Sequence, residues 1–132
     1  MQKPVKPAAA AVRPAKTDKP PQPWKPADAT DRIRKMARGD FDLLSGLHWE
    51  EQLEARNLIV GDLLYLLKNG FVYEPGVKST RPHLYKYEME YTTPNSHGRT
   101  VRVVLIPCAS ANTIKIVTIM WRDEAVISGS RR

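Results

Sequence analysis

His48 and Arg56 are the residues whose types and spacing best suit acid–base chemistry on a phosphate, and they stand at the two ends of a predicted helix over residues 48–56. On a helical wheel of about 100° per residue, Arg56 falls about 80° from His48, on the same arc as Trp49 and Leu53. The three glutamates of the segment fall on the opposite side. Arg56 therefore faces the protein interior, which is uncommon for arginine unless the side chain is paired or functional.

Two interpretations of this inward arginine are open. In the structural one, its stem packs beside Trp49 and its guanidinium binds carbonyls at the C-terminal end of the helix, where the helix dipole favours a cation. In the functional one, Arg56 binds a phosphate in a fork geometry that lysine cannot reproduce. His48 is likewise either a structural residue at the helix start or a proton carrier near neutral pH.

Metal-free RNA cleavage is the reaction that these residue types can support. Attack of a 2′-hydroxyl on the adjacent phosphorus needs a proton acceptor, a proton donor and cations for the charge that develops on the phosphoryl oxygens. We predict a catalytic set of His48, Arg56 and Tyr85, with Arg102 as a second cation, although a tyrosine on a strand face is alternatively part of the core. No metal site and no cofactor are predicted, because the histidines and the single cysteine lack zinc-ligand spacing and there is no phosphate-binding glycine loop.

Seven cations are candidates for nucleic-acid contact, four on one face of a predicted first helix and three on or beside the last two strands: Arg32, Arg34, Lys35, Arg38, Arg102, Lys115 and Arg122. Phosphate contacts from such residues give affinity that falls with salt. The alternative for the four helix cations is that they form only the solvated side of that helix.

The elements that must position these residues follow from the period of the apolar pattern, which changes from helical to alternating at Phe71. Helices are predicted over residues 30–38, 48–56 and 62–69, the last as the central core helix. Strands are predicted over residues 71–74, 83–91, 100–107 and 114–121. Helices followed by consecutive strands indicate an α+β fold, with two to three N-terminal helices packed on a four-stranded antiparallel meander sheet.

Strict alternation also assigns side chains to the two faces of these strands. In the strand over residues 83–91, Tyr87 and Met89 share one face and the acidic residues share the other, which should be solvated. In the last strand, Ile114 and Ile116 are predicted to oppose Ile119.

Composition divides the 132-residue chain near residue 28. Residues 1–27 contain seven of the eleven prolines and a net charge of +5, and they are predicted to form a disordered basic tail rich in Pro, Lys and Ala. Such a tail either attracts an anionic partner or serves as a solubilising spacer. Residues 28–127 are predicted to form one domain, and residues 128–132 a disordered C-terminus.

Cysteine usage and hydropathy bear on location. Cys108 is the only cysteine, so no intramolecular disulfide can form, and a small disulfide-stapled secreted scaffold is excluded. The N-terminus lacks the apolar stretch of a signal peptide, and the most apolar run, residues 101–108, is interrupted by Arg102. We therefore expect a cytoplasmic protein with no membrane segment.

Several short motifs in a fixed order resemble a family of small bacterial domains of unknown function that is related to the BrnT and RelE toxins. They are His48 placed eight residues before Arg56, the helix stop Asn69-Gly70, and the strand segments 84–87, 101–104 and 116–119. The resemblance covers roughly residues 44–123. It implies a RelE-like fold and a toxin of a toxin–antitoxin or toxin-delivery system that cleaves RNA, free or on the ribosome, with His48, Arg56 and Tyr85 at its site.

The same resemblance implies a cognate antitoxin or immunity protein as partner. The chain departs from the family pattern at Gln52, where the family commonly has arginine, and at Trp121, where it commonly has tyrosine. The first hypothesis is thus a toxin-like, metal-independent endoribonuclease of the mRNA interferase type. The second is a non-catalytic nucleic-acid- or protein-binding module of the same fold, and the third is a component of a mobile element or secretion apparatus tethered by the tail.

Overall fold

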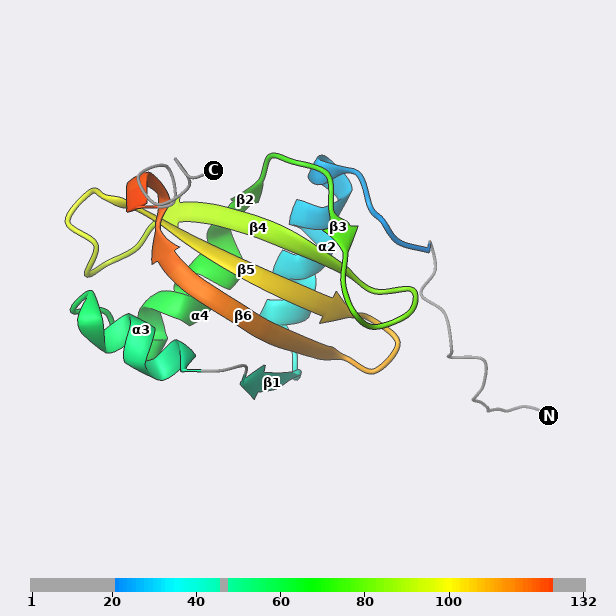
Figure 1. Cartoon of the computed structure of the whole chain (residues 1–132), viewed down its shortest axis with the longest axis horizontal. Helices are drawn as coiled ribbons and strands as arrows, with labels where there is room; N and C mark the ends of the chain where they lie inside the picture. The colour runs from blue at the N-terminus through cyan, green and yellow to red at the C-terminus, as the bar shows by residue number, and fades with distance from the viewer. Residues whose placement is uncertain (1–20, 46–47, 125–132) are drawn as a thin grey trace.

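The computed structural model describes residues 21–45 and 48–124, and these form an α+β fold. Its helices are α2 (Pro26–Arg38), α3 (Trp49–Ala55) and α4 (Val60–Asn69). Its strands are β1 (Asp42–Ser45), β2 (Phe71–Val72), β3 (Val77–Lys78), β4 (Tyr85–Thr92), β5 (Thr100–Cys108) and β6 (Thr113–Trp121). Figure 1 shows the long strands β4, β5 and β6 in front, with α2 and α4 behind them on one face of the sheet.

The sheet is mixed, with strand order β1-β6-β5-β4-β2, and β3 pairs with the other end of β4. β1 runs parallel to β6, whereas the other pairs are antiparallel. The predicted four-stranded antiparallel meander is therefore wrong. The α+β class and the four predicted strand regions are present, but β1 and β3 were not expected, because each is too short to show an alternating pattern.

The first helix begins before its predicted start. Pro26 occupies the first helical position, where its missing N–H and fixed φ fit a helix, so α2 starts four residues ahead of Thr30. Thr30 instead lies buried in the helix, and its hydroxyl accepts the backbone N–H of Val72 at 2.9 Å. This bond covers the outer edge of β2 and joins the helix layer to the sheet.

The folded part extends upstream of the predicted boundary at residue 28. Trp24 is 3% exposed, its ring stacks on Tyr87 with centroids 5.7 Å apart, and its backbone N–H donates to the Tyr87 hydroxyl at 2.8 Å. The Gln22 side-chain amide accepts the Tyr85 N–H and donates to the Pro107 carbonyl, both at 3.1 Å. Residues 21–27 thus belong to the fold, whereas the predicted disorder of residues 1–20 and 128–132 lies outside the described residues.

The core lies between the helices and the sheet, as predicted. Leu63, Leu66 and Leu67 of α4 are buried, which confirms its central position, and Tyr87 and Met89 are buried on the inner face of β4. The outer face of β4 carries its glutamates.

The predicted faces of β6 need one correction. Ile114, Ile116 and Ile119 are all buried on the same face. A register shift causes this, because Thr118 pairs with Val104 whereas Ile116 pairs with Leu105. The extra residue reverses the alternation within β6, and strict period-two reasoning assigned Ile119 to the wrong face.

Asp62 joins the start of α4 to the loop between β4 and β5. Its carboxylate accepts the Ile59 N–H at 2.9 Å, the Asn95 N–H at 2.9 Å and the Asn95 side-chain amide at 3.0 Å. Asp62 is only 2% exposed. These bonds satisfy a buried charge and fix the loop against the helix.

Candidate functional site

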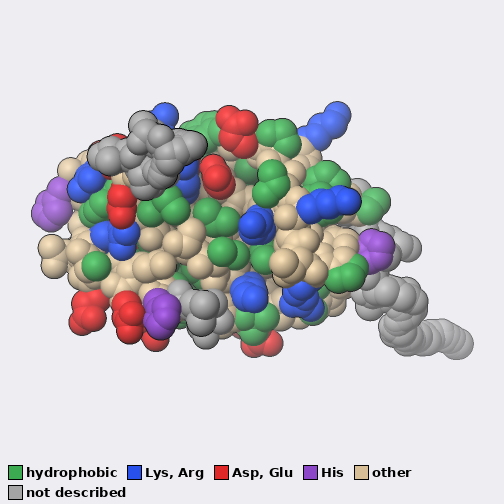
Figure 2. Space-filling view, viewed as in Figure 1, with side chains coloured by type: hydrophobic (Ala, Val, Ile, Leu, Met, Phe, Trp, Pro, Cys, Tyr) green, Lys and Arg blue, Asp and Glu red, His purple; other side chains and the backbone are tan. Residues whose placement is uncertain are grey.

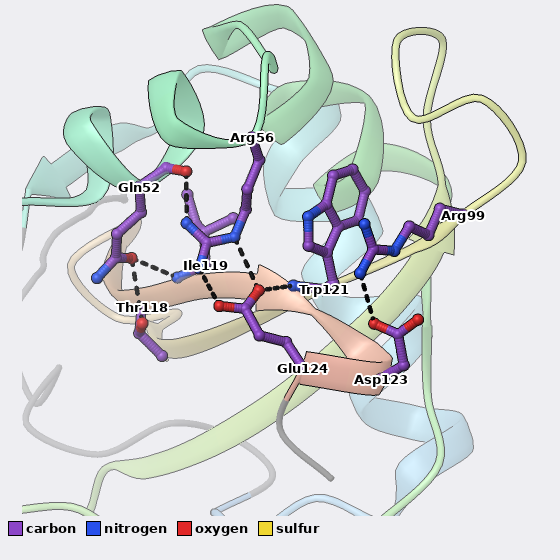
Figure 3. Close-up of polar contacts among 8 residues, drawn as sticks. All are labelled: Gln52, Arg56, Arg99, Thr118, Ile119, Trp121, Asp123 and Glu124. Atoms are coloured by element: carbon purple, nitrogen blue, oxygen red, sulfur yellow. Dashed lines mark hydrogen bonds and ion pairs between the residues drawn. The ribbon is translucent and has the colours of Figure 1, made fainter. Parts of the chain in front are cut away.

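Arg56 lies inward at the end of α3, as the helical wheel predicts, with its side chain 15% exposed. Its guanidinium meets the carboxylate of Glu124 in a fork, with Nε 3.0 Å from Oε1 and Nη2 2.5 Å from Oε2 (Figure 3). Its Nη1 donates to the Gln52 carbonyl at 2.7 Å. The structural interpretation of Arg56 is thus partly met, because the guanidinium does bind a carbonyl of its own helix.

Gln52 holds the neighbouring part of the β6 edge. Its side-chain oxygen accepts the Ile119 N–H at 2.6 Å and the Thr118 hydroxyl at 3.1 Å. Glu124 continues this role, since its Oε1 accepts the Trp121 N–H at 3.0 Å (Figure 3). β1 pairs with β6 only as far as Ile116, so these side chains take the place of a neighbouring strand for the rest of β6.

The charge state of Glu124 follows from these contacts. The hydrogen bond from Arg56 lowers the pKa of Glu124 below its usual range, and although burial opposes the shift, the Trp121 N–H adds to it. Glu124 is therefore ionised at neutral pH, and its carboxylate binds the Arg56 guanidinium and the Trp121 N–H. A phosphate at Arg56 would have to displace this carboxylate.

His48 and Tyr85 lie away from Arg56. The His48 side chain is 65% exposed, and its Nδ1 lies 3.2 Å from Glu51. Tyr85 begins β4, about seven residues along the sheet from the end of β6 that Arg56 contacts, which corresponds to roughly 20 Å. The structure does not bring the three predicted catalytic residues into one site.

The predicted nucleic-acid cations of α2 are largely occupied within the protein. Arg34 donates to the carbonyls of Asn69 and Gly70, both at 2.9 Å, and Arg38 donates to the Lys68 carbonyl at 2.8 Å. These bonds cap the C-terminal end of α4, where carbonyls lack helical partners and the dipole favours cations. Arg32 pairs with Asp28 at 2.9 Å in the helix, and the fourth cation, Lys35, is exposed.

The sheet face opposite the helices carries a groove of about 480 Å³, here called the charged groove. Its charged residues are Glu74, Glu88, Glu90, Arg102 and Arg122. Arg102 contacts Glu90 at 2.7 Å and Glu88 at 3.7 Å, and Arg122 lies 3.5 Å from Glu90. Three carboxylates thus exceed two guanidiniums, and Figure 2 shows acidic and basic side chains intermixed on this face.

Lys115 extends from the opposite end of β6. It pairs in register with Ile106 and is half-buried. Arg102 and Arg122 therefore share one groove, whereas Lys115 does not line it. The seven predicted cations do not form a single phosphate-binding surface.

An exposed aromatic cluster, which is not among the residues predicted from the sequence, wraps around the β2 edge of the sheet. It consists of Tyr65, Phe71, Tyr73 and Tyr91, with exposed fractions of 39%, 38%, 63% and 37%. The ring centroids of neighbouring members lie 5.6 to 6.2 Å apart, and the Arg34 guanidinium lies 4.5 Å from the Phe71 ring. Tyr73 and Tyr91 also line the charged groove, so the two surfaces are continuous.

A signal for this cluster was present in the sequence. Phe71 and Tyr73 occupy alternate positions beside the helix stop at Gly70, which predicts two rings on one side of a strand. Tyr65 and Tyr91 join them only through tertiary packing.

In comparisons with known proteins, no family model, curated protein or solved structure matched this chain. Among the described residues, no helix is both long enough and apolar enough to cross a membrane. The same residues hold no group of three or more histidine, cysteine or acidic side chains placed to bind a metal ion.

Proposed function

We propose that the folded part of this chain is a non-catalytic protein-binding module whose binding surface is the aromatic cluster. The observation that carries the proposal is the exposure of four contiguous rings at one edge of the sheet. Contiguous exposed apolar surface commonly marks an interaction site, and tyrosine and arginine are enriched among residues that dominate binding energy.

The charges favour a protein over a polyanion at this surface. Residues 21–124 carry 14 Lys and Arg against 13 Asp and Glu, so the folded part is nearly neutral. The charged groove beside the cluster has an excess of carboxylate, and its arginines are already paired. The partner that fits best presents apolar side chains to the rings and a basic segment to the groove.

The test is a comparison of three full-length proteins: the parent, Tyr73→Ser and Ile59→Ser. Ile59 is the matched control, because its side chain is 61% exposed but does not belong to the cluster. Proteins captured by the parent and Ile59→Ser, but not by Tyr73→Ser, are then purified and titrated against all three by calorimetry.

A hot-spot ring contributes at least about 2 kcal/mol, so Tyr73→Ser should weaken the purified complex about 30-fold or more. Ile59→Ser should bind as tightly as the parent. Equal affinity for all three proteins would exclude the cluster as the binding surface.

Toxin-type RNA cleavage is a second candidate function, supported by the charged groove. Arg102 and Arg122 would have to exchange their contacts with Glu90 for phosphoryl oxygens. Glu88, whose side chain is 45% exposed, would accept the proton. In this case the fold would be a variant of the RelE-like one, and the protein partner would be an antitoxin that covers the groove and the cluster. The groove, rather than His48 and Arg56, would then carry the chemistry.

RNA sequencing separates the two candidates. Growth arrest and new RNA 5′ ends on induction of the parent, absent with a folded Glu88→Gln variant, would establish cleavage. If a high level of folded parent leaves RNA and growth unchanged, RNA cleavage is excluded and the protein-binding module is the remaining candidate.

A further inference from the structure

The loop between β3 and β4 forms a second pocket, at the other end of β4 from the charged groove. The Ser79 hydroxyl donates to the Leu84 carbonyl at 2.8 Å and accepts the Arg81 N–H at 3.1 Å, which closes residues 79–84 into a compact turn. The Gln22 side chain lines the pocket and is itself bonded to β4 and β5. The loop therefore has a fixed base on the sheet.

The charges of this pocket are of one sign. Its lining includes Lys78, Arg81 and His83 together with the hydroxyls of Ser79 and Thr80, and no carboxylate. Lys78, Arg81 and His83 are exposed, and none of the ion pairs among the described residues involves them. Figure 2 shows basic side chains and a histidine gathered over the part of this face where Figure 1 draws β3.

This arrangement contrasts with the other cationic sites of the fold. Arg34, Arg38, Arg56 and Arg102 all donate to carbonyls or carboxylates of the protein. An arginine with its guanidinium free of protein acceptors can give a bidentate fork to an incoming anion, and a nearby lysine adds a point charge. Lys78 and Arg81, which take part in none of the ion pairs among the described residues, thus lie together at a preformed pocket of about 430 Å³.

We propose that this basic pocket, made by Lys78, Arg81 and His83 with Ser79 and Thr80, binds a phosphate group. Arg81 and Lys78 supply the charge, and the Thr80 hydroxyl supplies a hydrogen bond to a phosphate oxygen, whereas Ser79 holds the loop closed. The volume accommodates a phosphate with part of the molecule that bears it. Residues 1–20 add five Lys and Arg against one Asp, which raises the attraction of the whole chain for phosphate.

The test is a titration of the full chain with inorganic phosphate at low ionic strength, monitored by amide chemical shifts. A titration with chloride is the control. The expected result is saturable shifts confined to residues 78–85. Arg81→Ala should weaken phosphate binding about tenfold, because hydrogen bonds to charged groups contribute roughly 1.5 kcal/mol or more. Lys115→Ala, which removes a sheet cation that does not line the pocket, should leave binding unchanged. Shifts that are absent, not saturable, or insensitive to Arg81→Ala would overturn the proposal.

A single-stranded RNA of mixed sequence then identifies the source of the phosphate. If Arg81→Ala weakens RNA binding and inorganic phosphate competes, the pocket takes the phosphate of a nucleic-acid strand. If RNA binding is indifferent to Arg81→Ala while inorganic phosphate still binds in the pocket, the ligand is a small phosphorylated molecule. The protein partner of the aromatic cluster should bind Arg81→Ala as tightly as the parent, so failure of this proposal and failure of the protein-binding function are separately visible.

Discussion

The guanidinium of Arg56 lies in a fork against the carboxylate of Glu124, although 68 residues separate them in the sequence. Glu124 in turn accepts the Trp121 N–H, so the pair links the end of α3 to the edge of β6. Arg56 is the side chain that the sequence best suits to bind a phosphate, but in the structure it connects α3 to β6 through Glu124. The sites that we propose for binding are therefore the aromatic cluster and the basic pocket rather than the predicted catalytic set.

The Arg56–Glu124 pair should be energetically coupled. In a double-mutant cycle of Arg56→Ala and Glu124→Gln, measured by urea unfolding, we expect a coupling free energy of about 1 kcal/mol, because Glu124 is partly exposed and solvent screens the pair. The more exposed Arg99–Asp123 pair is the matched control and should show less coupling. Equal coupling in the two pairs would contradict the structural role of Arg56.

Gln52 should stabilise this fold more than arginine, the residue common at this position in the family that the sequence resembles. Gln52→Ala leaves the Ile119 N–H without its acceptor, which should lower the free energy of unfolding by about 1–2 kcal/mol. In Gln52→Arg the new side chain cannot accept a hydrogen bond, and it places a second cation beside Arg56. This variant should therefore lose at least as much unfolding free energy as Gln52→Ala. Thermal unfolding of the three proteins checks the order, and a Gln52→Arg variant as stable as the parent would refute it.

Asp62 should give the fold part of its acid sensitivity. Burial alone would raise the pKa of Asp62, but hydrogen bonds from the Ile59 and Asn95 N–H groups and the Asn95 side chain lower it below 3.8. A carboxyl with a depressed folded-state pKa stabilises the protein fully above about pH 5, and this stabilisation is lost as the pH falls below 3.8 through the folded value.

The measurement is urea unfolding of the parent and Asp62→Asn from pH 7 to pH 3. The variant should lose about 1–3 kcal/mol at neutral pH, and the difference should shrink in acid. Asp28→Asn, which removes a surface pair, should change stability by less than about 1 kcal/mol. A difference between parent and Asp62→Asn that does not change with pH would count against the carboxylate as the cause.

Gly70 should not tolerate a side chain. A Cβ at this position would lie 2.6 Å from the Leu66 carbonyl oxygen and 2.9 Å from the Met89 side chain. Gly70→Ala should therefore lower the free energy of unfolding by about 1–3 kcal/mol. A Cβ at Gly61 would lie 3.5 Å from its nearest atom, so Gly61→Ala should be neutral or slightly stabilising. Chemical unfolding of both variants tests this difference.

Local pattern was sufficient to locate the long elements of the fold, although it missed the start of α2 and the faces at the end of β6. The helical wheel placed Arg56 inward, and alternation placed Tyr87 and Met89 in the core, because both depend only on neighbouring residues. β1 was not predicted because its four residues become a strand only by pairing with β6. Trp24 was assigned to a disordered tail for a similar reason, since its burial depends on Tyr87, 63 residues away.

The candidate site was less predictable than the fold. A single sequence gives the direction of Arg56 but not the presence of Glu124, and it gives four cations on α2 but not the free carbonyls of α4 that bind two of them. The aromatic cluster also joins residues from α4, β2, β4 and the segment after β2. Such combinations are set by tertiary packing, so periodicity alone cannot identify them.

The most direct test of the protein-binding function is calorimetric titration of the captured partner into the parent, Tyr73→Ser and Ile59→Ser, each shown to be folded by circular dichroism. We predict a saturable complex that Tyr73→Ser weakens about 30-fold or more and Ile59→Ser leaves unchanged. The same affinity for all three proteins, or no saturable complex with a folded parent, would contradict it.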